Sequence, residues 1–248
     1  MFLIPFFAVL FPIFIGQRYG LYRTKKSERL QRGSVASIVA AAISLLAFML
    51  AFTFQIAANK YMERKELFIE EITNIRTTYL RAGLVPEPFR SHTRKLLIEY
   101  VDLRVELVKD LSRIDKALFR SQQILDTFWN YAETLAAQDR SSEAYSLYTA
   151  SVNDLVNNYN QRITATLEYR IPAPVFWVLF IITIFSGYML GYQFGVSGGL
   201  NRTLSVMLAT IFAVVMFLIL ALDRSESRLI KLNQKPMINL QQQLHEKQ

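Results

Sequence analysis

The chain has 248 residues, 52% of them hydrophobic, and no cysteine, so disulfides and thiolate metal sites are excluded. Its formal charge of +8 does not indicate a nucleic-acid partner, because the basic excess lies beside long uncharged stretches, where Lys and Arg meet anionic lipid head groups. Residues 1–17, 34–59, 171–201 and 203–222 contain no Asp, Glu, Lys or Arg. Uncharged runs of about 18 or more residues are typical of membrane spans. The sequence therefore predicts an all-α integral membrane protein with four transmembrane helices in contact with a lipid bilayer.

The first transmembrane helix is predicted over 1–22. It lacks the charged start and the small-residue cleavage site of a signal peptide, so we expect it to be retained. Pro5 and Pro12 predict an irregular helix. A basic loop over 23–33 follows.

The second transmembrane helix is predicted over 34–59. Small residues recur on one of its faces and predict helix packing: Ser37, Ala41 and Ser44. No Gly or Pro interrupts the chain between 34 and 82. We therefore expect one helix over 35–81, about 70 Å long and longer than the membrane is thick.

The stretch 60–170 is polar. Residues 58–170 include sixteen basic and sixteen acidic side chains, so this region carries no net charge. Apolar residues recur there at helical spacing in four segments, separated by short breaks. This pattern predicts a helical-bundle domain inserted between the second and third spans. Glu70 and Glu71 are expected on a solvated, mixed-charge helix face, and His92 and His245 on the surface.

The third and fourth transmembrane helices are predicted within 171–222, joined by a short Gly-rich loop. Gly187, Gly191 and Gly195 recur every four residues and predict a packing face, with a broken segment lining a permeation path as the alternative. A polar tail over 223–248 follows. Asp223 and Arg224 at its start are expected to form an interfacial ion pair, with a role in conduction or gating as the alternative.

Four spans place both termini and the inserted domain on one side of the membrane. The Lys and Arg residues near the span ends are almost equally divided between the two sides, so the positive-inside rule leaves both orientations open.

Four strings resemble the bestrophin-like family of uncharacterised bacterial membrane proteins. They are LLAFMLAFTFQIAANKYMERKELFIEEITNIRTTYLR (45–81), VPEPFR (85–90), LILALDR (218–224) and LIKLNQKPMINLQQQL (229–244). The resemblance covers nearly the whole chain, and the last string is its most specific part. Members often continue with Pro and Gly after the position of Arg224, where this chain has Ser225.

The family is distantly similar to bestrophins, which are pentameric anion channels with a neck of apolar residues on the second span. The resemblance therefore implies a homo-oligomer, with a pentamer as one candidate, inorganic anions as partners, and a cytoplasmic inserted domain in a bacterial plasma (inner) membrane. It also implies a pore constriction at Phe48, Phe52 and Ile56; packed or lipid-facing side chains are the alternative. The acidic calcium clasp of animal bestrophins is not matched, because only Asp223 and Glu226 are present.

No phosphate-binding loop, nucleophile elbow or metal-ligand cluster occurs, so no enzyme and no cofactor are predicted. The leading hypothesis is an oligomeric anion channel. The alternatives are a non-conducting sensor or scaffold whose helical domain binds a partner or ligand, and a purely structural membrane protein.

Overall fold

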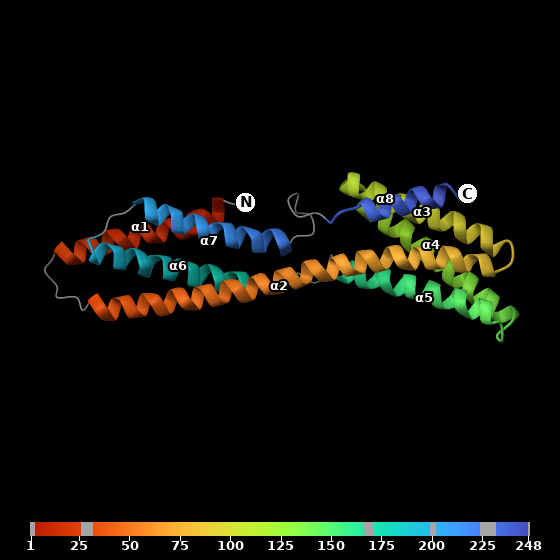
Figure 1. Ribbon diagram of the computed structural model, residues 1–248, viewed down its shortest axis with the longest axis horizontal. Helices are drawn as coiled ribbons and strands as arrows, with labels where there is room; N and C mark the ends of the chain where they lie inside the picture. Colours follow the sequence, from red (N-terminus) through yellow and green to blue (C-terminus); the bar gives the residue numbers. More distant parts are fainter. Residues whose placement is uncertain (1–2, 26–31, 166–170, 199–201, 224–231, 248) are drawn as a thin grey trace. The chain divides into compact units, whose positions relative to one another are not determined.

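The computed structural model describes residues 3–25, 32–165, 171–198, 202–223 and 232–247 (Figure 1). The described residues form helices and no strand. The α-helices are α1 (Leu3–Lys25), α2 (Arg32–Arg81), α3 (Phe89–Lys109), α4 (Ile114–Gln138), α5 (Glu143–Ile163), α6 (Ala173–Val196), α7 (Arg202–Asp223) and α8 (Lys235–His245). Two short 3-10 helices, η1 (Ala82–Leu84) and η2 (Leu111–Arg113), precede α3 and α4.

Four of these helices, α1, α2, α6 and α7, are long and apolar enough to cross a membrane. The prediction of an all-α protein with four membrane spans is thereby confirmed. The prediction of one uninterrupted helix over 35–81 is also confirmed, because α2 runs for 50 residues. It ends where Gly83 and Pro86 follow, at residues that disfavour further helix.

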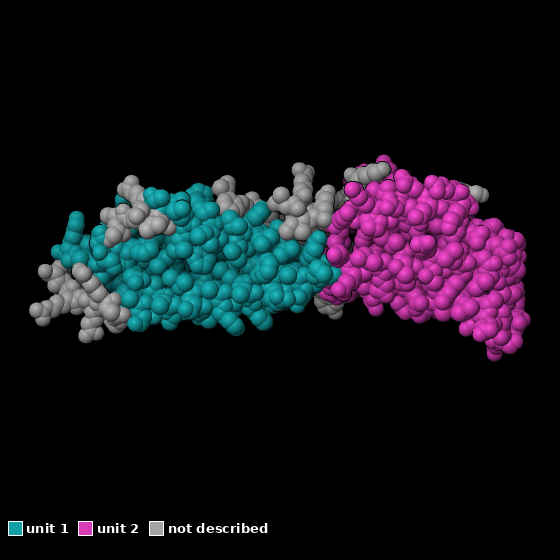
Figure 2. Space-filling model, in the orientation of Figure 1, with its two compact units in different colours: residues 1–62, 170–231 teal, residues 63–169, 232–248 magenta. Residues whose placement is uncertain are grey.

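The chain divides into two compact units, coloured separately in Figure 2. Unit 1 consists of Met1–Met62 and Arg170–Lys231, and unit 2 of Glu63–Tyr169 and Leu232–Gln248. The helix α2 contributes its first part to unit 1 and its last part to unit 2.

Unit 1 contains α1, α6, α7 and the apolar part of α2. One cluster of buried side chains joins α2 to α6 and α7, through Leu50, Leu179 and Met216. A second joins α1 to α7, through Ile13 and Ala209. The helix α1 is continuous from Leu3 to Lys25 with Pro12 in its interior, so neither proline ends it. Neighbouring helices and local adjustment tolerate a proline in a membrane helix.

Unit 2 is a helical bundle around one apolar core, to which Ile75, Tyr100, Phe128 and Leu155 contribute. All four apolar segments predicted from the sequence contribute to this core. On α3, Tyr100 of the predicted stripe is fully buried and Leu96 and Leu103 pack against the core, with Leu97 and Val101 buried beside them. The predicted break after α4 is capped by Ser142, whose Oγ accepts a hydrogen bond from the N–H of Tyr145 at 3.4 Å.

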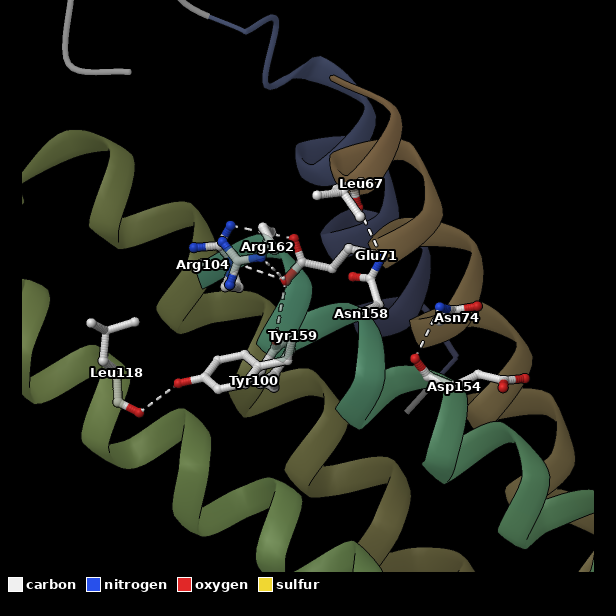
Figure 3. Close-up of polar contacts among 10 residues, drawn as sticks. All are labelled: Leu67, Glu71, Asn74, Tyr100, Arg104, Leu118, Asp154, Asn158, Tyr159 and Arg162. Carbon is white, nitrogen blue, oxygen red and sulfur yellow. Dashed lines mark hydrogen bonds and ion pairs between the residues drawn. The ribbon is translucent and has the colours of Figure 1, made fainter. Parts of the chain in front are cut away.

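The last part of α2 is tied to α5 by hydrogen bonds from side chains to main-chain carbonyls, two of which are drawn in Figure 3. The four bonds are Asn158 Nδ2 to Leu67 O (3.1 Å), Asn74 Nδ2 to Asp154 O (3.3 Å), Thr78 Oγ1 to Ser151 O (3.2 Å) and Arg81 Nη1 to Leu147 O (2.9 Å). The two helices are therefore antiparallel, and their register is set by polar as well as apolar contacts.

The C-terminal segment also belongs to unit 2. The sequence suggests a polar tail there, with an apolar patch at Met237, Ile238 and Leu240. In the structure, α8 places Met237, Leu240 and Leu244 in the core of unit 2 and leaves Ile238 exposed. Its polar side is bound to α3, because Gln241 Nε2 donates to Asp102 Oδ1 at 2.7 Å and His245 Nε2 lies 3.0 Å from the same oxygen.

Candidate functional site

A stripe of exposed residues follows the transmembrane part of α2. Its members are spaced three or four residues apart, which places them on one helix face: Ser37, Ala41, Ser44, Phe48, Phe52, Gln55 and Asn59. We call this set the α2 stripe. The three small residues predicted to pack lie at one end of the stripe, and two hydrogen-bonded amides lie at the other, with Gln55 Nε2 donating to Asn59 Oδ1 at 2.7 Å.

The two phenylalanines occupy the middle of the α2 stripe. Phe48 is 66% exposed and Phe52 is 56% exposed, and their rings stack with centroids 6.4 Å apart. Ile56, the third residue of the predicted constriction, lies at the edge of this face and packs partly buried against the cluster that joins α2 to α6 and α7. The structure therefore brings Phe48 and Phe52 together and sets Ile56 apart.

Thr53 lies on the opposite side of α2. It is fully buried, and its Oγ1 donates to Met49 O at 2.7 Å. A threonine that hydrogen-bonds within its own helix costs little inside a membrane protein. The polar side chains that follow Phe52 on the α2 stripe are therefore Gln55 and Asn59, not Thr53.

The glycines of α6 lie against α1 at backbone distance. A Cβ on Gly191 would stand 2.0 Å from Ile13 O, and one on Gly195 would stand 2.4 Å from Gln17 O. Gly187 is less restricted, because a Cβ there would stand 3.3 Å from Val9 O. Only glycine lets two helix backbones approach this closely in lipid.

Two glycines of α1 complete this contact and were missed in the sequence. A Cβ on Gly16 would stand 2.1 Å from Tyr188 O, and one on Gly20 would stand 2.4 Å from Tyr192 O. Their spacing of four residues is the same signal as in α6. Because the residue numbers of the paired positions increase together along both helices, α1 and α6 run parallel.

Asp223 ends α7 and is buried. Its Oδ1 accepts a hydrogen bond from the N–H of Ile171 at 3.0 Å, just before α6 begins. The expected ion pair with Arg224 lies partly outside the described residues, because Arg224 is not among them. What the structure shows is a link from Asp223 to the chain that leads into α6.

In unit 2, the structure corrects the expected solvated face at Glu70 and Glu71. Glu70 is exposed, but Glu71 is fully buried, because adjacent residues on a helix point about 100° apart. Arg104 donates to both carboxylate oxygens of Glu71, at 3.0 and 3.3 Å, and the Tyr100 hydroxyl donates to Oε1 at 2.8 Å (Figure 3). Arg162 Nε lies 3.4 Å from the same Oε1.

These contacts control the ionisation of Glu71. Burial alone would raise the pKa of this carboxyl, but the guanidinium groups of Arg104 and Arg162 and the Tyr100 hydroxyl outweigh burial and hold the pKa of Glu71 below its ordinary value. The same burial, together with the negative charge of Glu71, raises the pKa of the Tyr100 hydroxyl. Glu71 is therefore charged and Tyr100 neutral at physiological pH.

The described residues contain no group of three His, Asp or Glu side chains placed to hold a metal ion. His92 and His245 are both exposed. His245 contacts Asp102, and His92 lies beside the Tyr131 ring, with centroids 6.4 Å apart.

Known proteins are similar to this chain over most of its length. The family model of the bestrophin-like domain matches residues 6–226. Two crystal structures of point mutants of a bacterial bestrophin homologue from Klebsiella pneumoniae superpose with TM-scores of 0.72 and 0.70, at 14% and 16% identity. They cover 98% and 99% of this chain, and 97% and 98% of theirs. A further crystal structure, of a mutant described as a membrane protein, has a TM-score of 0.71 at 14% identity over 99% of this chain and 97% of its own. No curated protein sequence matches significantly.

Proposed function

Because this chain belongs to the bestrophin-like family, we propose that it assembles as a homo-oligomeric channel for small inorganic anions, with the α2 stripe facing the central axis. The observation that carries this proposal is the exposure of the α2 stripe in a single chain.

The apolar part of α2 has few partners within its own chain. Only 17% of the most apolar window of α2 is buried, against 39% for the corresponding windows of α1 and α7. Lipid chains pack well around large apolar side chains. They make little contact with Ser37, Ala41 and Ser44, whose small size favours close approach of another helix. Copies of α2 from neighbouring subunits would use this small-residue end in a symmetric ring.

A ring of subunits would bring copies of Phe48 and Phe52 together around the axis. A narrow apolar constriction conducts only when it is wetted, and it gates an ion path by dewetting. The adjoining amides of Gln55 and Asn59 would offer N–H donors to an ion that leaves its water shell. No charged side chain of the α2 stripe takes part, so selection would rest on dimensions and on amide dipoles.

Anion flux into liposomes tests the proposal. Purified protein is reconstituted, and chloride flux is measured for the wild type, for Phe48→Ala and Phe52→Ala, and for Phe185→Ala. Phe185 is the matched control, because it is 60% exposed on the membrane helix α6 but lies outside the α2 stripe. We expect the two α2 variants to change the flux severalfold by widening the constriction, and Phe185→Ala to leave it unchanged.

Oligomeric state is measured on the same samples by particle imaging in detergent. A ring with α2 at its centre is expected. A monomer that gives no flux would contradict the channel and favour the non-conducting sensor or scaffold. If all three phenylalanine variants change the flux equally, α2 does not line the permeation path.

A further inference from the structure

We propose that unit 2 binds one small monovalent anion at Arg162, on the buried ionic cluster formed by Glu71, Arg104 and Arg162 (Figure 3). The site is separate from the α2 stripe and does not depend on channel activity.

Two other arginines of unit 2 each bind a carboxylate through the Nε and Nη2 edge of the guanidinium, which we call the fork, and Arg162 has no such partner at this edge within the parts of the chain that the structure describes. Arg104 holds Glu71 through its Nε and Nη2, and Arg120 holds Glu99 through the same two atoms at 2.6 and 2.9 Å. This edge of the guanidinium presents two parallel N–H donors, which match an oxoanion or a halide. In Arg162, both Nε and Nη2 are buried without a hydrogen-bonded acceptor among the described residues.

The charges of the cluster do not cancel. In the described part of unit 2, the ion pairs of Arg104 and Arg162 both end on Glu71, so two guanidinium groups share one carboxylate. Glu71 has no exposed surface, and each arginine side chain is only 13% exposed. An excess positive charge in such surroundings is costly unless a counter-charge accompanies it. One monovalent anion balances the cluster, whereas a divalent anion would leave it negative.

Arg162 lies over the Tyr159 ring, 5.8 Å from its centroid, and its ion pair with Glu71 is weak. Its Nε lies 3.4 Å from Glu71 Oε1, an oxygen that already accepts from Tyr100 and Arg104. Oε1 therefore already accepts two hydrogen bonds, and the Arg162 fork makes none with Glu71. One turn earlier on α5, Asn158 Oδ1 is likewise buried without a hydrogen-bond donor. A water molecule that accompanies the anion would satisfy this acceptor, whereas water alone would leave the excess charge of the cluster unbalanced.

The test is a thermal unfolding titration of the full-length protein in detergent. Sodium gluconate, whose anion is too large for a buried fork, is replaced stepwise by sodium chloride or sodium nitrate at constant ionic strength. We expect a saturable rise in the unfolding temperature of about 5 °C, because an anion bound only by the folded state stabilises that state. Arg162→Met should abolish the rise, and Arg120→Met should retain it, because the Arg120 fork is already filled by Glu99.

A second measurement does not require the variant to fold. Crystals of the wild type soaked in bromide should show an anomalous peak within hydrogen-bond distance of the Arg162 fork. The proposal is overturned if the wild type unfolds at the same temperature in gluconate, chloride and nitrate, if Arg162→Met keeps the saturable rise, or if bromide occupies other positions and not this one.

Discussion

Glu71 binds two arginines and a tyrosine at once, so its removal affects more than one ion pair. Glu71→Gln keeps the shape of the side chain but leaves Arg104 and Arg162 buried without a carboxylate. Breaking a buried pair by removing one partner costs about 3–5 kcal/mol. We therefore expect the unfolding temperature in detergent to fall by at least about 5 °C. Glu70→Gln, on the exposed neighbour, is the control and should change it by less than about 1 °C.

The pH dependence of stability offers a separate test of the same residue. The pKa of Glu71 is lower in the folded state than its ordinary value of 4.5. Its contribution to stability is therefore fully present above that value and is lost as the pH falls through the folded-state pKa. The difference in unfolding temperature between wild type and Glu71→Gln should shrink as the pH is lowered below about 4.5. A difference that stays constant down to pH 3 would contradict a charged Glu71 in the folded state.

At this scale the sequence is only partly informative. The apolar spacing that places Phe68, Ile75 and Tyr79 in the core is visible in the sequence, and all three are buried. Glu71 lies on the same side of α2, but nothing local to it distinguishes it from Glu70. Its partners are 29 to 91 residues away, on α3 and α5. A buried charge is specified by such distant partners, which periodicity does not contain.

Among the elements, α1 and α6 make the closest contact, and their glycines should respond to substitution in a graded way. Gly191→Ala would place a methyl group 2.0 Å from Ile13 O, which forces the two backbones apart. Gly187→Ala is the matched control, because its methyl group would stand 3.3 Å from Val9 O. Overpacking costs about 1–3 kcal/mol, and contact with a rigid backbone belongs at the upper end. We expect Gly191→Ala to lower the unfolding temperature by about 5 °C or more, and Gly187→Ala by less than half as much. Equal effects would mean that α1 and α6 separate easily.

The helix α8 allows a second prediction at the scale of elements. Leu240 lies in the core of unit 2, whereas Ile238 on the same helix is exposed. Leu240→Ala should cost about 2–3 kcal/mol and loosen α8 from unit 2. Limited proteolysis should then release the C-terminal segment at least severalfold faster from Leu240→Ala than from wild type. Ile238→Ala should behave like wild type. If the two variants are cut at the same rate, α8 does not depend on this apolar contact.

The elements were largely predictable, and the exceptions have physical causes. Long uncharged runs define the four membrane helices, since lipid contact permits no substitute for apolar side chains. The absence of Gly and Pro predicts the length of α2, and this signal too is local in the sequence. The helix α8 was not predicted, because eleven residues with three buried side chains acquire a stable helix only by packing on a distant surface. The pairing of α1 with α6 was missed in part, because the Gly16 and Gly20 signal requires comparison of two helices far apart in the chain.

At the scale of the whole molecule, the charges near the span ends leave both orientations in the membrane open, and the family favours a cytoplasmic position for the polar residues of unit 2. We therefore predict that Arg140, in the exposed turn between α4 and α5, is cytoplasmic, and that Ser197, after α6, is on the other side. The chain has no cysteine, so Arg140→Cys and Ser197→Cys each carry a single thiol and can be labelled without background. In intact bacterial spheroplasts, a membrane-impermeant maleimide should label Ser197→Cys at once and Arg140→Cys only after permeabilisation. The opposite pattern would place the bundle outside the cell. Labelling of both positions in intact spheroplasts would mean that α6 does not cross the membrane, because positions separated by one span lie on opposite sides.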